Sequence, residues 1–319
     1  QGLNVFIVSW RNPGPEDAGY GLDDYVRSLD HASEIVTEVS GSSNIHIAGA
    51  CSGGITMSML LSYWAAKGID RAASATFLVT ILDTEGASNT SMGLFANMEI
   101  LELAKTISRT KGVIEGDDLA KVFAWLRPND LIWAYWINNY LMGQNPPAFD
   151  MRYWNDDTTN MSASLHNDYM TLLETNGLED GSAVVLGEKA DLSKVTCDSY
   201  VLGGTTDHIT PWEGCYRTVN MLGGTSEFVL SSSGHIQAIV NPPSNRKAKF
   251  PRMTNPPKDA EAFLGQGTEV EGTWWLNWAE WLGERSKKEQ AAPSSTGNAD
   301  YPALCAAPGS YVHQKAGKA

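Results

Sequence analysis

The sequence predicts an α/β fold in which a parallel sheet is covered by helices and interrupted by an inserted, mainly helical segment. Short β-branched runs alternate with longer amphipathic stretches up to about residue 83, as in a parallel sheet. This alternation fails between residues 85 and 195 and resumes after residue 196. With 42% hydrophobic and 19% charged residues among 319, the chain can fill the core of one elaborated domain, which excludes global disorder.

Residues 1–84 are predicted to form the first part of the sheet, in the order strand, helix, strand, helix, strand. The helices have apolar side chains at helical spacing, and Gly68 is placed to end the second one. The expected strands are Asn4–Ser9, Ile45–Ala48 and Ala75–Leu82, and the expected helices are Leu22–Val39 and Ile55–Ala66.

Residues 85–195 are predicted to form a mostly helical cap inserted into the sheet domain. Aromatic segments, Phe123–Leu126 and Ile132–Trp136, are separated by Arg127–Asp130. Aromatic side chains in such a segment usually pack in a core, although they also line apolar ligand channels.

Residues 196–285 are predicted to complete the sheet, with strands at Ser199–Leu202 and Glu227–Leu230. Farther along, Trp274, Trp278 and Trp281 share one face of a helix, which we expect to dock on the body of the domain. Residues 286–319 are rich in Ala, Pro, Ser and Gly and are expected to form an extended arm.

Charge and cysteine content exclude several classes of protein. The 37 acidic and 23 basic residues give a net charge of −14, which disfavours nucleic acid as a partner. The apolar runs fall short of the roughly 18 to 20 residues that cross a bilayer, so no transmembrane segment is expected. Four cysteines without a CxxC pair indicate reduced thiols of a cytosolic protein. No metal and no cofactor are expected.

The most informative segment is a strand that ends in Gly49-Ala50-Cys51-Ser52-Gly53 and opens a helix. This pattern is typical of the nucleophile elbow of the α/β-hydrolase fold, with Cys51 where serine usually stands. Glycines two positions before and after Cys51 would let strand and helix approach without Cβ clashes. The helix N-terminus favours a thiolate, and the backbone N–H of Ser52 would stabilise an oxyanion. The alternative is a glycine-rich turn with an inert buried cysteine.

A thiol nucleophile needs a base, and the base needs an orienting carboxylate. In this fold the chain order is nucleophile, acid, histidine. Asp207 and His235 each follow a predicted strand, at turns where these residue types are expected. His208 is the rival base, although its place beside Asp207 favours a role in loop packing. The remaining candidates in regular elements, His31 and His46, are interpreted as structural.

Several long motifs together resemble those of the single-subunit poly(3-hydroxyalkanoate) synthases, of class I or II. They are Val8–Pro13, the box around Cys51, Leu126–Leu131, Trp154–Asp157, Asp207–Trp212, Ser233–Gln237 and Asn241–Pro243. The resemblance implies a Cys51-His235-Asp207 triad that polymerises (R)-3-hydroxyacyl-CoA into a growing polyester chain with release of CoA. The CoA thioester is a substrate, so no cofactor is implied. It also implies homodimers on cytoplasmic polymer storage granules. Some stretches favour the medium-chain enzymes.

The resemblance also implies that family members carry further strands before the segment where this chain starts. Gln1 is therefore interpreted as an N-terminal truncation point. The region expected to be missing includes the loop with the second oxyanion donor, and its loss would expose a sheet edge.

The chemistry expected of this family makes two demands on the remaining residues. Water must be excluded from an acyl-Cys, which an apolar cap would do, and the CoA phosphates need a basic patch in an acidic protein. Arg246 and Lys247 are candidates for that patch, or else part of a solvated loop; Trp133 and Trp154 are further candidates for substrate contacts. The alternatives to a polymerase are a thioesterase or esterase with the same triad and a non-catalytic granule-associated protein.

Overall fold

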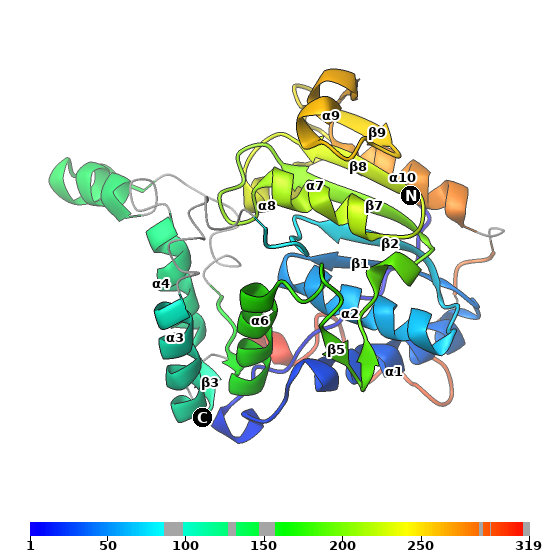
Figure 1. Ribbon diagram of the computed structural model, residues 1–319, viewed down its shortest axis with the longest axis horizontal. Helices are drawn as coiled ribbons and strands as arrows, with labels where there is room; N and C mark the ends of the chain where they lie inside the picture. The colour runs from blue at the N-terminus through cyan, green and yellow to red at the C-terminus, as the bar shows by residue number, and fades with distance from the viewer. Residues whose placement is uncertain (86–97, 127–131, 147–156, 287–289, 294, 315–319) are drawn as a thin grey trace. The chain divides into compact units, whose positions relative to one another are not determined.

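The computed structural model describes the chain except residues 86–97, 127–131, 147–156, 287–289, 294 and 315–319 (Figure 1). The chain divides into two compact units. The sheet unit comprises residues 1–6, 22–90 and 172–304, and the helical unit comprises residues 7–21, 91–171 and 305–319. No helix among the described residues is long and apolar enough to cross a membrane.

A six-stranded sheet forms the centre of the sheet unit, in the spatial order β1-β2-β7-β8-β9-β10. Neighbours from β1 to β8 pair in parallel, whereas β9 pairs antiparallel with both β8 and β10. The strands are β1 (Ile45–Ala50), β2 (Ala72–Leu78), β7 (Asp198–Gly204), β8 (Ser226–Ser231), β9 (Lys249–Thr254) and β10 (Thr268–Glu271).

Two crossover helices connect the parallel strands. Helix α2 (Ser52–Lys67) joins β1 to β2, and α7 (Trp212–Met221) joins β7 to β8. Both crossovers advance in the same direction along the sheet. Because such connections are right-handed, both helices cover the same face.

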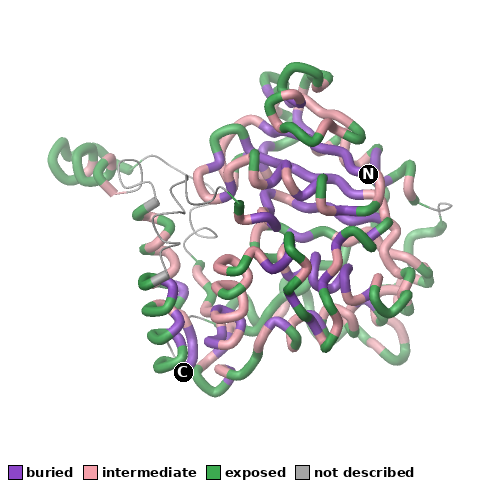
Figure 2. The backbone as a smooth tube through the Cα atoms, in the orientation of Figure 1, coloured by how far each residue is buried: buried purple, intermediate pink, exposed green. Residues whose placement is uncertain are grey.

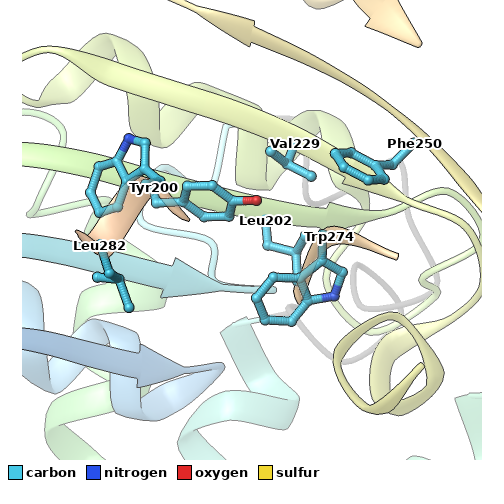
Figure 3. Packing of buried hydrophobic residues seen from close by; sticks show 7 residues of the cluster. Tyr200, Leu202, Val229, Phe250, Trp274 and Leu282 are labelled. Atoms are coloured by element: carbon cyan, nitrogen blue, oxygen red, sulfur yellow. The ribbon is translucent and has the colours of Figure 1, made fainter. Parts of the chain in front are cut away.

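The opposite face of the sheet is covered by α10 (Trp274–Arg285). Its Trp274 is fully buried against Tyr200 and Leu202 of β7, in a cluster completed by Val229, Phe250, Trp281 and Leu282 (Figure 3). The Nε1–H of Trp278 donates to the Thr76 hydroxyl at 3.0 Å. The predicted docking of this tryptophan face is therefore confirmed.

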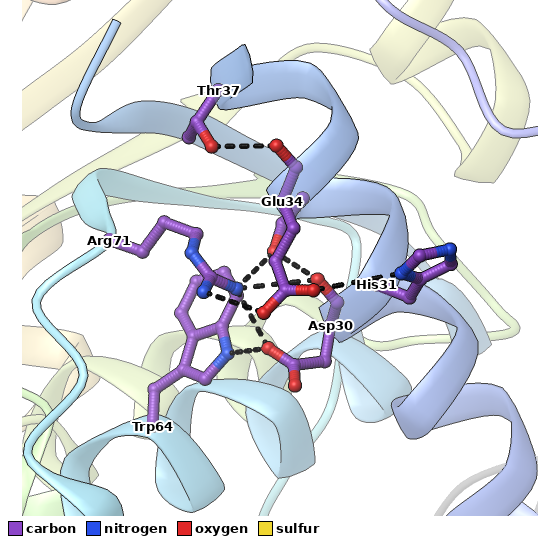
Figure 4. A network of polar contacts seen from close by, with 7 residues as sticks. Asp30, His31, Glu34, Thr37, Trp64 and Arg71 are labelled. Carbon is purple, nitrogen blue, oxygen red and sulfur yellow. Dashed lines mark hydrogen bonds and ion pairs between the residues drawn. The ribbon is translucent and has the colours of Figure 1, made fainter. Parts of the chain in front are cut away.

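Hydrogen bonds join α1 (Leu22–Ser40) to α2 and to the residues that follow α2. The Arg71 guanidinium donates to the carboxylate of Asp30 at 2.8 Å, and the Trp64 indole donates to the same oxygen at 2.7 Å (Figure 4). Arg71 also lies over the Trp64 ring, 5.3 Å from its centroid. This network holds α1 against the helix that carries the Cys51 turn.

Shorter elements complete the sheet unit. They are β5 (Val184–Val185), β6 (Glu188–Lys189), the 3₁₀ turn η6 (Leu192–Lys194), α8 (His235–Val240) and α9 (Ala260–Gln266).

The helical unit is organised around a short antiparallel pair, in which Val113 of β3 faces Ser162 of β4. Asn160 joins its parts, because it accepts a hydrogen bond from Gly116 N at 3.0 Å and donates to the Pro13 carbonyl at 3.1 Å. The elements are η1 (Pro15–Asp17), α3 (Met98–Lys111), β3 (Val113–Ile114), α4 (Gly116–Leu126), the π-helical η5 (Trp136–Leu141), β4 (Met161–Ser162), α6 (Ala163–Thr175, which continues into the sheet unit) and the 3₁₀ turn η7 (Tyr311–His313).

Two predicted strands differ from the structure. The strand at Asn4–Ser9 is wrong: these residues have no regular structure, and Ile7 is 87% exposed. A β-branched run is stable as a strand only when another strand pairs with it, and no described strand pairs with this one. The strand expected at Ala75–Leu82 runs instead from Ala72 to Leu78, because the chain turns at Val79, where φ is +46°.

The interpretation of the cap aromatics as core residues is also wrong for the described ones. Trp125 of α4 is 58% exposed, and Trp133 and Trp136 are 47% and 49% exposed. The helical segment around η5 is coloured as exposed over most of its length (Figure 2). These rings contribute little to a core in this chain.

Candidate active site

Cys51 occupies the sharp turn between β1 and α2. Its backbone has φ 50° and ψ −122°, an unfavourable conformation for a residue with a side chain. The turn is held by two backbone hydrogen bonds of 2.9 Å, from Cys51 N to the Leu78 carbonyl and from Gly54 N to the Cys51 carbonyl. The side chain remains partly exposed. A strained residue at the start of a helix is the arrangement that the nucleophile elbow requires.

Two glycines allow this turn, but they are not the expected pair. A Cβ atom on Gly49 would lie 2.7 Å from the Gly53 carbonyl oxygen, and one on Gly54 would overlap the Thr80 side chain. A Cβ atom on Gly53 would meet nothing within 4 Å. The prediction that Gly53 prevents a clash is therefore wrong, since its carbonyl, and not its Cα hydrogen, faces the strand.

Thr80, two residues after the end of β2, lies against this turn. Its buried hydroxyl lies 3.2 Å from the carbonyl oxygens of both Cys51 and Leu78 and can donate to either. The preceding residue, Val79, is fully buried with a positive φ, and its N–H donates to the Leu202 carbonyl at 2.8 Å. Strained backbone is common at functional sites, so the positive φ values of Cys51 and Val79 make this edge of the sheet a candidate site.

Asp207 and His235 lie at the carboxyl ends of the next two strands, β7 and β8. The Nδ1 atom of His235 is 2.8 Å from Oδ2 of Asp207, and the Asp207 side chain is fully buried. The loops that carry them are tied together, because Ser233 N donates to the Thr205 hydroxyl at 3.0 Å. The structure thus places the side chains of Asp207 and His235, both predicted from the sequence to be site residues, in direct contact.

The carboxylate of Asp207 is surrounded by hydrogen-bond donors. The N–H groups of Ile209 and Thr210 donate to Oδ1, both at 2.9 Å, and the Thr210 hydroxyl donates to Oδ2 at 2.7 Å. Burial alone would raise the pKa of Asp207, but hydrogen bonds from His235 and Thr210 lower it below its ordinary value. The side chain is therefore a carboxylate at neutral pH.

His235 interacts with both neighbours of the site. Burial alone would lower the pKa of His235, but hydrogen bonds and charge interactions with Asp207 and Cys51 raise it to about 10. An imidazole between a carboxylate and a thiol can take the thiol proton and hold it as an imidazolium. Thus Cys51, His235 and Asp207 form one electrostatic unit.

The other three cysteines differ from Cys51 in their surroundings. Burial raises the pKa of Cys197 to about 11, and it raises that of the fully buried Cys215 well above its ordinary value. Cys305 is exposed, and none of the four cysteines forms a disulfide. Cys51, in contrast, interacts with the imidazole of His235 through a hydrogen bond and through charge.

The histidines interpreted as structural make contacts of that kind. The ring of His46 lies between the hydroxyls of Ser74 and Ser286, at 2.7 and 3.1 Å, and His31 lies 3.6 Å from Glu34. His208 is half-buried on the loop between Asp207 and Thr210.

The remaining predicted site residues lie in several places. Ser52 is the first residue of α2, so its backbone is at the helix N-terminus. Arg246 and Lys247 are exposed on the loop after α8. Trp133 belongs to the helical unit, and Trp154 lies outside the described residues. No group of His, Cys, Asp and Glu within the described part of the chain could hold a metal ion.

Thr210 is the site residue that sequence reasoning missed. It was part of the Asp207–Trp212 motif, but no role was assigned to it. A local sequence pattern could have indicated it. Aspartate side chains commonly accept hydrogen bonds from backbone N–H groups two and three residues later, and here the third residue is a threonine.

Comparison with known proteins gives one family and several relatives. The model for the alpha/beta hydrolase fold matches residues 1–242. Poly(3-hydroxyalkanoate) polymerases 1 and 2 of Ectopseudomonas oleovorans are each 46% identical to the chain over 98% of its length and 56% of their own. The poly(3-hydroxyalkanoate) polymerase subunit PhaC of Cupriavidus necator is 36% identical over 99% of the chain and 55% of its own length. The predicted resemblance is confirmed, and the chain spans about half the length of these relatives.

The chain is also similar to solved structures of hydrolases. A monoacylglycerol lipase of Paleococcus ferrophilus aligns with a TM-score of 0.44 and 15% identity, over 84% of this chain and 77% of that one.

Proposed function

The chain belongs to the α/β-hydrolase fold family, and we propose that it polymerises (R)-3-hydroxyacyl-CoA thioesters through an acyl-Cys51 intermediate. The observation that carries the proposal is the 2.8 Å contact of His235 with buried Asp207, together with the interaction of His235 with Cys51. The names of the relatives supply the substrate class.

In the first half-reaction His235 takes the proton of Cys51. The thiolate then attacks the carbonyl carbon of the thioester, and the bond from that carbon to the CoA sulfur breaks. His235 returns its proton to the leaving CoA thiolate. Asp207 stays ionised and holds the ring throughout, as its lowered pKa requires.

In the second half-reaction the acyl group passes to an alcohol. His235 takes the proton from a 3-hydroxyl group, whose oxygen attacks the carbonyl of acyl-Cys51. The carbon–sulfur bond breaks, Cys51 leaves as a thiol once His235 returns the proton, and the polyester is one unit longer. A thioester is a more activated acyl donor than an ester of serine, so a cysteine nucleophile suits transfer to an alcohol.

Each half-reaction passes through an oxyanion, for which we assign the backbone N–H of Ser52. Ser52 begins the 16-residue helix α2, so the positive end of the helix dipole lies beside the Cys51 carbonyl adduct. A backbone donor held by a helix needs no rearrangement as charge develops.

Other parts of the proposal concern the partners. Arg246 and Lys247 follow α8, the helix that His235 begins, and we assign them to the CoA phosphates. Trp133 and Trp154 are assigned to the acyl or polymer chain. We further propose that the protein acts as a homodimer at the surface of cytoplasmic polymer granules, as the resemblance implies.

A thioesterase with the same residues is the second candidate, because the Asp207–His235 pair would activate water as well as an alcohol. Incubation with 3-hydroxybutyryl-CoA and 3-hydroxydecanoyl-CoA separates the candidates. A polymerase releases CoA together with polymer, whereas a thioesterase releases CoA together with free hydroxy acid. Labelling of the thiol without CoA release would support a non-catalytic granule protein.

A further inference from the structure

We propose that Thr210 is a positioning residue that fixes the tautomer and orientation of His235 through its hydroxyl group. The inference rests on the proposed function only in taking His235 as the base for Cys51. It concerns a group that lies between the acid and the base, in contact with both.

The Thr210 hydroxyl lies at the centre of the acid–base contact. Its Oγ1 atom donates to Asp207 Oδ2 at 2.7 Å and lies 3.0 Å from His235 Nδ1. The same two partners are 2.8 Å from each other, so the three atoms form a closed triangle. Thr210 is 8% exposed, which leaves little room for water to replace its hydroxyl.

The direction of these hydrogen bonds determines the histidine tautomer. A hydroxyl has a single proton, and that of Thr210 is used on the Asp207 carboxylate. Toward His235 the oxygen of Thr210 is therefore an acceptor, as is Oδ2 of Asp207. Two acceptors around Nδ1 require a proton on Nδ1, so the other ring nitrogen, Nε2, is left as the base for Cys51.

Thr210 also fixes the second oxygen of the carboxylate. Oδ1 of Asp207 is held by the N–H groups of Ile209 and Thr210. The hydroxyl of Thr210 adds a donor to Oδ2, so the carboxylate cannot rotate without breaking hydrogen bonds on both oxygens. Loss of that hydroxyl removes one of the two side-chain contacts that the described residues make to Oδ2, so the ring and the carboxylate can turn together more easily.

The main chain of Thr210 is itself well held. Its carbonyl accepts a weak hydrogen bond from the buried Cys215 thiol at 3.5 Å, and the next residue, Pro211, caps α7. The charges of Asp207 and Cys51 act on His235, and those of Asp207, Cys51 and Glu213 act on the neighbouring thiol of Cys215. A conservative substitution at residue 210 leaves all of them in place.

Alkylation of Cys51 by iodoacetamide tests the proposal without any acyl substrate. The rate is measured against pH by peptide mapping for the unmodified protein, Thr210→Val and Thr210→Ser. Val keeps the shape of Thr without the hydroxyl, and Ser keeps the hydroxyl. We expect Thr210→Val to raise the pH midpoint of alkylation by about one pH unit, because the imidazolium that pairs with the thiolate is less well held.

The turnover of acyl-CoA gives a second readout. Loss of one hydrogen bond to a charged group corresponds to a fall of about tenfold to a hundredfold, which we expect in kcat for Thr210→Val with little change in KM. Thr210→Ser is expected to restore the alkylation midpoint and most of kcat. Melting curves confirm that each variant is folded.

Two results would overturn the proposal. One is a folded Thr210→Val protein with an unchanged alkylation profile, and the other is a folded Thr210→Ser protein as impaired as Thr210→Val. Failure of the proposed function gives a different pattern. Iodoacetamide would then alkylate Cys51 of the unmodified protein normally, but that protein would release no CoA from hydroxyacyl-CoA.

Discussion

Gly49 lies so close to Gly53 that a Cβ atom on Gly49 would be 2.7 Å from the Gly53 carbonyl oxygen. The atom it would meet belongs to the first turn of α2, which cannot move without displacing Cys51. The close approach of strand and helix thus depends on a missing methyl group at residue 49. The turn at Cys51 therefore depends on close packing between β1 and α2 as well as on the backbone angles of Cys51.

Substitution of the two glycines is expected to have opposite effects. Gly49→Ala should destabilise the fold by about 1–3 kcal/mol, the usual range for an inserted methyl group without room. Gly53→Ala should be neutral or stabilising by up to about 1 kcal/mol, because the position is open and helical. Urea unfolding of both variants checks this, and equal losses would mean that the close approach at Gly49 is not rigid.

Thiol reactivity should be concentrated at Cys51. At pH 7 iodoacetamide is expected to modify Cys51 before the buried Cys197 and Cys215, whose thiols have raised pKa values. Cys51→Ala should remove acyl transfer, whereas Cys305→Ser should leave it unchanged as the matched control. Peptide mapping of the alkylated protein gives the order, and faster modification of Cys197 or Cys215 would contradict the assignment.

Substitution of His235 and of His208 in turn should show which of the two histidines acts as the base. His235→Gln is expected to reduce kcat by several orders of magnitude, as for other members of a catalytic triad. His208→Gln should keep a measurable fraction of kcat, because the Asp207 contact at 2.8 Å is made by His235. Turnover of a hydroxyacyl-CoA measures both, and greater damage in the His208 variant would transfer the role of base to His208.

The pH dependence of stability should reveal the charged form of His235. Its pKa is about 10 in the folded protein and near 6.5 in the unfolded chain, so the folded state binds the proton more tightly. The resulting stabilisation is fully present below pH 6.5 and is lost as pH rises through 10. The free energy of unfolding of the protein minus that of His235→Gln should therefore fall over this range. A difference that stays constant between pH 6.5 and 10 would mean that folding does not raise the pKa of His235.

Much of the sheet unit could be predicted from sequence because its pattern is local. The helix expected at Leu22–Val39 is α1, and the strands expected at Ile45–Ala48, Ser199–Leu202 and Glu227–Leu230 lie within β1, β7 and β8. Helix α2 ends as expected before Gly68, which has φ +67°. These helices and strands bury one or both faces in the core, so the spacing of their apolar residues directly indicates the type of element.

Features that depend on tertiary contacts were not predictable in the same way. Strands β9 and β10 pair with each other, but their sequences lack a clear alternation of apolar and polar residues, and no strand was predicted there. The Asn4–Ser9 run has the composition of a strand but has no described pairing partner. The position of Gly53 relative to Gly49 depends on how the helix rotates against the strand, which spacing alone does not specify.

The proximity of the candidate site residues Asp207 and His235 was predictable, because chain order and strand ends strongly restrict where such residues lie. Asp207 and His235 follow adjacent parallel strands, whose carboxyl ends meet at one edge of the sheet. Thr210 was missed because a hydroxyl three residues after an aspartate has many structural uses, and its contact with His235 is visible only in three dimensions.

The most direct test of the proposed acyl-Cys51 mechanism is the identity of the acylated residue. The protein is mixed with 3-hydroxydecanoyl-CoA, quenched in acid within one turnover and digested, and the peptides are analysed by mass spectrometry. We expect a hydroxyacyl adduct on Cys51, equal in amount to the CoA released, that decays as polymer forms. An adduct on another residue, or polymer formed by a Cys51→Ala protein, would contradict it.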